Sequence, residues 1–132
     1  MTTIANMPYS DKFSFADIGY MGVSVPNGTG TPVVAADAGK PLTMGTGGFE
    51  VAGAGEAIMG FLADMDADNT LTIQVEGFAL CTMAADAVAV GDYCVGAAGG
   101  TIGPNGTSGS TTASNVIAFY KVSSTSMWVK ML

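Results

Sequence analysis

The spacing of apolar side chains between residues 70 and 80 constrains the fold more than any other feature of this chain. In the segment TLTIQVEGFAL, every second residue up to Val75 is apolar and the residues between them are polar. A period of two is typical of a strand with one buried face. Phe78 and Leu80 then fall on the opposite parity, with Gly77 at the change of phase. This pattern predicts a β-bulge or bend at Gly77 that returns Phe78 and Leu80 to the core face.

Further strands are expected on both sides of this segment. Residues Ala57–Ala63 are apolar on both parities, which predicts a strand covered on both faces, and an acidic turn follows them. Asn27-Gly28 is a strong hairpin-turn signal, so Thr31–Ala36 is a candidate returning strand. Ala84–Val88 is compatible with a single helical turn. The other expected strands are Met21–Val25, Pro41–Met44, Phe49–Ala52, Asn115–Lys121 and Met127–Leu132.

Composition favours one small all-β domain with an attached arm. Of 132 residues, 48% are apolar, 19 are glycine and only 11% are charged, which suits short strands and many turns and argues against disorder. Residues 21–132 are predicted to be the β domain, and residues 1–20 an extended N-terminal arm. Residues 103–114 (GPNGTSGSTTAS) are low in complexity and are predicted to be a flexible Gly/Ser/Thr loop.

The charge of the chain argues against two classes of partner. The net charge is −7, there is no arginine, and the four lysines at positions 12, 40, 121 and 130 are scattered. Nucleic acids and anionic membranes are bound through clustered Lys and Arg, so neither is an expected partner. The N-terminal residues lack the charged and apolar regions of a signal peptide. No apolar run approaches the roughly 18 residues of a membrane span.

The sequence offers little for catalysis or metal binding. Without histidine, the usual general base and the commonest metal ligand are missing. Asp64–Asp68 resembles the start of a calcium loop, but the sixth and twelfth positions hold Asn69 and Val75 in place of Gly and Glu. A solvated hairpin turn is the favoured interpretation, with weak adventitious calcium binding as the alternative. We expect no enzymatic activity, no catalytic residues, no metal and no cofactor.

Two cysteines, Cys81 and Cys94, lie within apolar strand patterns. Cysteine commonly packs as a small apolar side chain, and nothing in the sequence signals export to an oxidising compartment. Buried free thiols are therefore favoured over a disulfide between the two.

Apolar residues near both ends are candidate contacts. Phe13, Phe15 and Ile18 either cap the core of the domain or anchor the arm on a neighbouring subunit. Phe119, Met127 and Trp128 are candidates for the core or for an interface between copies of the chain. Nine methionines and few charges leave more apolar surface than a lone domain readily hides, which predicts a homotrimer with an apolar interface.

Three segments together resemble a known family. They are GEAIMGFLADMDADNTLTIQVEGFALC, AVAVGDYCVGAAGGTI and the closing VIAFYKV with MWVKML. Their strands and turns, over about two-thirds of the chain, resemble the small head decoration (capsid cement) proteins of tailed bacteriophages. The resemblance implies a small β-barrel or β-tulip-like domain. It also implies a viral structural protein that sits as a homotrimer on the outer capsid surface of the virion and bridges subunits of the major capsid protein.

Two other classes of function stay open at this point. One is a carbohydrate-binding β-module, which needs exposed aromatic side chains such as Trp128 and tyrosines. The other is a fibre or tail component, for which internal repeats are expected. The sequence contains only one weak internal similarity, between residues 58–61 and 116–119.

Overall fold

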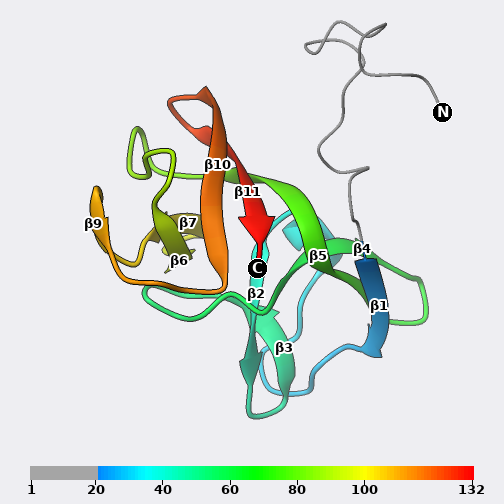
Figure 1. Ribbon diagram of the computed structural model, residues 1–132. Coiled ribbons are helices and arrows are strands. Elements are labelled where there is room, and N and C mark those ends of the chain that lie inside the picture. Colours follow the sequence, from blue (N-terminus) through cyan, green and yellow to red (C-terminus); the bar gives the residue numbers. More distant parts are fainter. Residues whose placement is uncertain (1–20) are drawn as a thin grey trace, which may run out of the picture.

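Strand β5 (Thr70–Thr82) is shared by both halves of the domain. The computed structural model describes residues 21–132. The first half of β5 pairs with β4 (Gly60–Met65) and with β1 (Met21–Pro26). Its second half pairs with β11 (Ser126–Met131). Figure 1 shows β1 on one side of the view and β6 (Tyr93–Ala97), β7 (Thr101–Pro104) and β9 (Ser110–Thr111) on the other, with β5 running between them.

The flanking sheet packs over the smaller of two cores. It has the order β3-β2-β4-β5, where β2 (Pro41–Gly45) and β3 (Gly48–Val51) form a tight hairpin. This hairpin confirms the strands that the sequence predicted around the glycine-rich joint at residues 45–48. The buried side chains of this core are Val33, Leu42, Leu62, Leu71 and Ile73.

The second half of β5 belongs to a closed ring of strands. β11 pairs with β10 (Val116–Ser123), β10 with β6 (Tyr93–Ala97), and β6 with β7 (Thr101–Pro104). A parallel bridge from Ile102 to Met83 returns the ring to the end of β5. The interior is filled by apolar side chains such as Cys94, Ile102, Met127 and Val129. The all-β prediction is therefore confirmed, and this half is a small barrel.

The expected hairpin after β1 is wrong. β1 pairs with β5, and the segment Thr31–Ala36 contains no strand but leads into a short 3₁₀ helix, η3 (Ala35–Asp37). The side chain of Asn27 explains the difference. Its amide nitrogen donates to the oxygens Val33 O (2.7 Å) and Asn69 Oδ1 (2.8 Å), and its Oδ1 accepts from the Val33 N–H (3.0 Å). Asn27 thus closes an irregular loop onto the β4–β5 turn, which a hairpin signal does not anticipate.

The predicted consequence of the phase change at Gly77 is wrong for Leu80, although Phe78 is buried as expected. Gly77 does adopt a positive φ of 96°, as a bend requires. Nevertheless the core side stays on the same parity, with Ala79 and Cys81 buried, while Leu80 is 48% exposed. Gln74, expected on a polar face, is buried, and its amide nitrogen donates to the carbonyls of Glu76 (3.1 Å) and Phe78 (2.7 Å) across the bend. The bend is therefore held without moving the core to the other face.

Strand β4 is shifted relative to the expected strand at Ala57–Ala63, because it begins at Gly60 and continues to Met65. Two residues near its start are covered by different cores: Phe61 lies in the barrel core and Leu62 in the flanking core. Met59 and Ala63 are exposed. The reason is that β4 lies between two cores only over these two residues.

Two connecting segments also have a different structure from the one that their sequence predicts. Ala84–Val88 forms a turn with a hydrogen bond from Ala87 N to Ala84 O (2.9 Å) and no helix. The segment 103–114, expected to be a flexible loop, contains the end of β7 and a short hairpin of β8 (Gly106–Thr107) and β9 (Ser110–Thr111). Side-chain hydrogen bonds to Asp92 and Tyr93, described below, attach this hairpin to the barrel.

Candidate interaction surface

Apolar side chains lie next to one another across three neighbouring strands of the barrel. Trp128 on β11 is paired in register with Leu80 on β5 and with Tyr120 on β10. Residues directly opposite in antiparallel strands point to the same face of a sheet. Phe78 precedes Leu80 by two residues on β5, and its ring meets that of Phe119 edge-to-face, with centroids 4.9 Å apart. We call these five residues the aromatic face.

The aromatic face is open to solvent over much of its area. Leu80, Phe119 and Tyr120 are 48%, 46% and 54% exposed, whereas Phe78 is buried and Trp128 is half-buried. Phe78, Leu80 and Trp128 also line a shallow groove of about 280 Å³ that extends to Gly39 and Ala63. Contiguous exposed apolar side chains of this kind mark contact sites for macromolecules more often than isolated ones do.

The three candidates near the C-terminus, Phe119, Met127 and Trp128, do not all lie in the same environment. Met127 is fully buried in the barrel core, and Trp128 lies on the opposite face of the same strand. Phe119 joins Trp128 on the aromatic face because the register of β10 shifts between Ala118 and Tyr120. The arm candidates Phe13, Phe15 and Ile18 lie outside the described residues.

Sequence reasoning missed Leu80 and Tyr120 as surface contacts. Both are apolar residues in strand patterns, and such patterns are ordinarily assigned to a core. The alternation along β5 could have identified Leu80, because Ala79, Cys81 and Met83 form a continuous buried row on one face of the strand. Leu80 must then point outward, together with its neighbour in register, Trp128.

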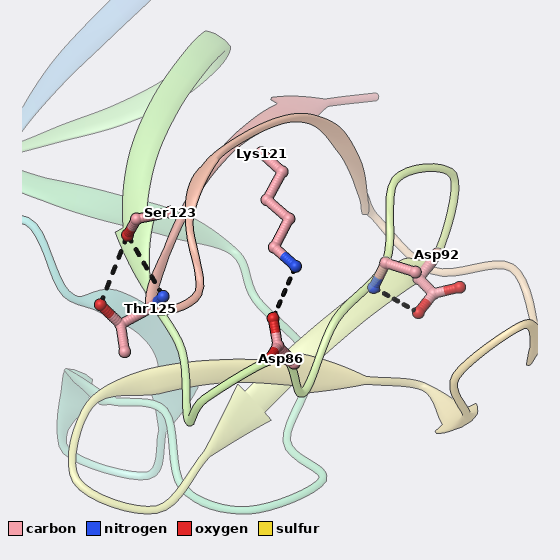
Figure 2. Close-up of polar contacts among 6 residues, drawn as sticks. Asp86, Asp92, Lys121, Ser123 and Thr125 are labelled. Carbon is pink, nitrogen blue, oxygen red and sulfur yellow. Dashed lines mark hydrogen bonds and ion pairs between the residues drawn. The ribbon is translucent and has the colours of Figure 1, made fainter.

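Charged groups border this surface but do not form a reactive cluster. Lys130 lies opposite Phe78 in the register of β11 and β5, and its side chain is exposed. Lys121 at the far end of β10 pairs with Asp86, with Nζ 2.6 Å from Oδ1, beside the turn that Ser123 and Thr125 stabilise (Figure 2). Within residues 21–132, no group of three or more His, Cys, Asp or Glu side chains is placed to hold a metal ion. The acidic run at residues 64–68 spans the end of β4 and the exposed β4–β5 turn.

Asp92 is the one buried carboxylate of the described chain, and its hydrogen bonds hold the β8–β9 hairpin. Its Oδ2 accepts from the Ala89 N–H (2.9 Å) and from the Ser108 hydroxyl (2.7 Å), and its Oδ1 accepts from the Gly109 N–H (3.0 Å). Burial raises the pKa of Asp92, but these three hydrogen bonds outweigh it, so the pKa lies below its ordinary value. Thr111 adds a further link by accepting from the Tyr93 N–H (3.0 Å). This arrangement is structural, because two of the hydrogen bonds attach the β8–β9 hairpin and the third closes the turn at residues 89–92.

Both cysteines are free and buried in the barrel. Burial raises the pKa of Cys94 to about 12, and the negative charge of Asp92 adds to the effect while a backbone hydrogen bond from Ala118 opposes it. Burial also raises the pKa of Cys81 well above its usual range, with a smaller contribution from Cys94. The prediction of buried thiols is confirmed for this structure.

We expect both thiols to resist a disulfide reagent in the folded protein at pH 8. Reaction requires the thiolate, and a pKa of about 12 leaves a thiolate fraction on the order of 10⁻⁴ at that pH. Ellman's reagent should label both cysteines in urea, and label them at least 100-fold more slowly without it. A Ser124→Cys variant is the control, since residue 124 is exposed and its thiol should react at once. Rapid labelling of the native chain, or a mass 2 Da lower than that of the dithiol, would contradict this prediction.

Comparison with protein-family models, with curated proteins and with solved structures found no match to this chain. Within residues 21–132, no helix is long and apolar enough to cross a membrane. The site must therefore be interpreted from its own geometry. That geometry offers an apolar face for binding, on a domain in which every buried side-chain nitrogen and oxygen atom of residues 21–132 has a hydrogen-bond partner.

Proposed function

We propose that this chain is a capsid decoration protein of a tailed bacteriophage. In this role it binds the outer surface of the head, contacts the major capsid protein, and stabilises the shell by bridging neighbouring subunits. Three copies are proposed to meet around each three-fold point, with Phe119 and Trp128 of the aromatic face as candidate contacts between them. The proposed function is structural, with no catalysis and no nucleic acid partner.

The observation that carries this proposal is the aromatic face. A chain with a net charge of −7 keeps three large apolar side chains about half exposed on β5 and β10, the two strands that flank β11, where solvation alone would favour polar residues. The barrel provides a rigid platform for them. The resemblance of the sequence to decoration proteins supplies the class of partner. On a capsid lattice, many modest contacts of this kind reinforce one another through avidity.

The test is binding to decoration-free shells of the phage that encodes the chain. Full-length protein mixed with expanded empty shells should co-sediment at saturation with the number of three-fold sites, and cryo-microscopy should show density of barrel size there. A Leu80→Ser/Tyr120→Ser variant should lose at least 10-fold in affinity, because both exposed apolar side chains contribute to contacts on the lattice.

A matched variant, Val34→Ser/Val90→Ser, removes two equally exposed apolar side chains outside the aromatic face and should bind as the wild type does. Absence of barrel-sized density on shells at tens of micromolar protein would refute the proposed function. Retention of the protein on a glycan array through Tyr120 and Trp128 would support the carbohydrate-binding alternative instead, which the aromatic composition of the face keeps open.

A further inference from the structure

We infer that two copies of this chain pair through the outer edge of β1 when the protein is free in solution. In this pair, β1 of one copy and β1 of the second copy form an antiparallel ladder across a two-fold axis. The inference is separate from the three-fold arrangement proposed on capsids, because it uses neither the aromatic face nor a shell.

The outer edge of β1 presents backbone groups that lack partners among the described residues. β1 pairs with β5 on one side only. The Asn27 N–H donates to Asn69 O (3.0 Å), which continues this register and turns the backbone groups of the odd-numbered residues toward β5. The N–H and C=O groups of Gly22 and Ser24 therefore point away from the sheet. Pro26, which has no N–H, falls on the same outward parity, as is usual for proline in an edge strand.

β1 also lacks the features that ordinarily prevent pairing at a sheet edge, such as charged side chains and a covering loop. β3, at the opposite edge of the flanking sheet, has both. It carries Glu50, and the loop after β1 covers the turn that leads into it, where the Thr29 N–H donates to Gly47 O (3.0 Å). β1 has no charged residue, and Met21–Ser24 are exposed. Its one irregularity of register lies at its first residue and leaves Gly22–Pro26 regular.

The outward backbone groups are complementary to a second copy of themselves. A two-fold axis at Val23 places Gly22 of each strand opposite Ser24 of the other. Each of these two pairs can exchange two N–H···O hydrogen bonds, which gives about four across the axis. Val23 then meets its own copy as a non-hydrogen-bonded pair, in which the Cα atoms are about 4.5 Å apart.

The apolar side chains of β1 favour the same arrangement. Met21, Val23 and Val25 share one parity, so they lie on one face of the strand. Met21 and Val23 are 49% and 37% exposed, and the two-fold axis brings Met21 beside Val25 of the second copy. The pairing therefore covers exposed apolar surface without bringing like charges together. A contact of one short strand belongs to the weak class of interfaces, so we expect dimers at concentrations on the order of 100 μM and dissociation on dilution.

A cysteine at the two-fold axis tests the pairing directly. Val23→Cys places two thiols opposite each other at a Cα separation that a disulfide can span. With oxidised glutathione at 100 μM protein, this variant should form a disulfide-linked dimer at least 10-fold faster than Val90→Cys, whose site is 59% exposed but lies outside β1. The native Cys81 and Cys94 are buried and do not contribute. Equal rates for the two variants would overturn the inference.

Sedimentation equilibrium of the full-length chain gives an independent measurement. The mean mass of the wild type should rise from one chain toward two between 5 and 500 μM. Ser24→Pro removes an outward N–H without removing a hydrogen bond to β5, and it should abolish this rise. Ser24→Ala keeps the N–H and should behave as the wild type does.

Far-ultraviolet circular dichroism checks that each variant is folded. A wild-type mass that does not change with concentration contradicts the inference, and so does a rise in mass that a folded Ser24→Pro variant retains. Neither measurement involves shells, so failure here is distinguishable from failure of the proposed function.

Discussion

Replacing Met127 by alanine should destabilise the domain more than any other truncation of a methionine in the described chain. Met127 is 0% exposed and lies in the barrel core with Cys81, Val129 and Ile102. Burial of this side chain removes apolar surface from water, and the cavity left by alanine cannot be refilled by a rigid ring of strands. The expected loss in the free energy of unfolding is about 2–5 kcal/mol, measured by urea denaturation.

The same substitution at Met44 provides the control. Met44 is 56% exposed on β2, so Met44→Ala changes the same number of atoms without opening a core cavity. Its expected effect is within about 0.5 kcal/mol. Equal effects of the two substitutions would mean that the barrel interior is not packed as described.

Substitution of Asp92 by asparagine should destabilise the attachment of the β8–β9 hairpin and change the response of the protein to acid. Both carboxylate oxygens accept hydrogen bonds, from Ala89, Ser108 and Gly109. An amide must turn its NH₂ group toward at least one of these donors, and an unsatisfied buried group costs about 1–3 kcal/mol. We therefore expect a loss of that size at pH 7.

The acid dependence follows from the lowered pKa of Asp92 in the folded state. A carboxyl whose folded pKa is below its unfolded value, about 3.9 for aspartate, stabilises the fold fully above that value. This contribution is lost as the pH falls through the folded pKa. The stability curves of the wild type and of Asp92→Asn should therefore run parallel above about pH 5 and converge below pH 4.

Asp86→Asn is a matched control for this experiment. Asp86 is exposed, its ion pair with Lys121 lies at the surface, and its positive φ of 55° suits asparagine as well as aspartate. Its expected effect is within about 0.5 kcal/mol at all pH values. If the difference in the free energy of unfolding between wild type and Asp92→Asn stays constant down to pH 3, the charged form of the carboxylate contributes nothing specific to stability.

The strands of this protein were predictable where both partners are close in sequence. The β2–β3 hairpin and the β10–β11 pair follow from alternation and turn residues alone. The partner of β1 was not predictable, because β5 lies more than forty residues away and the Asn-Gly signal at residues 27–28 suggested a local return. Asn27 instead uses its side chain to close a loop, and no local pattern encodes that.

The candidate surface could be predicted only in part, for a different physical reason. Alternation shows which residues share a face, but it does not show whether that face meets a core or solvent. Phe78 and Leu80 were assigned to the core because they are apolar, whereas Leu80 is half exposed. Trp128 and Met127 are adjacent apolar residues, and only the ring of strands decides which of them points inward.

Sharing β5 between two cores has a consequence for how relatives of this chain can diverge. Leu71 and Ile73 fill one core and Ala79 and Cys81 the other, all on one parity of a single thirteen-residue strand. Insertion or deletion of one residue between Ile73 and Ala79 would turn one row of side chains away from its core while leaving the other in place. We therefore expect length changes to be accommodated in the exposed turns, such as the acidic β4–β5 turn and residues 123–126, and not within β5.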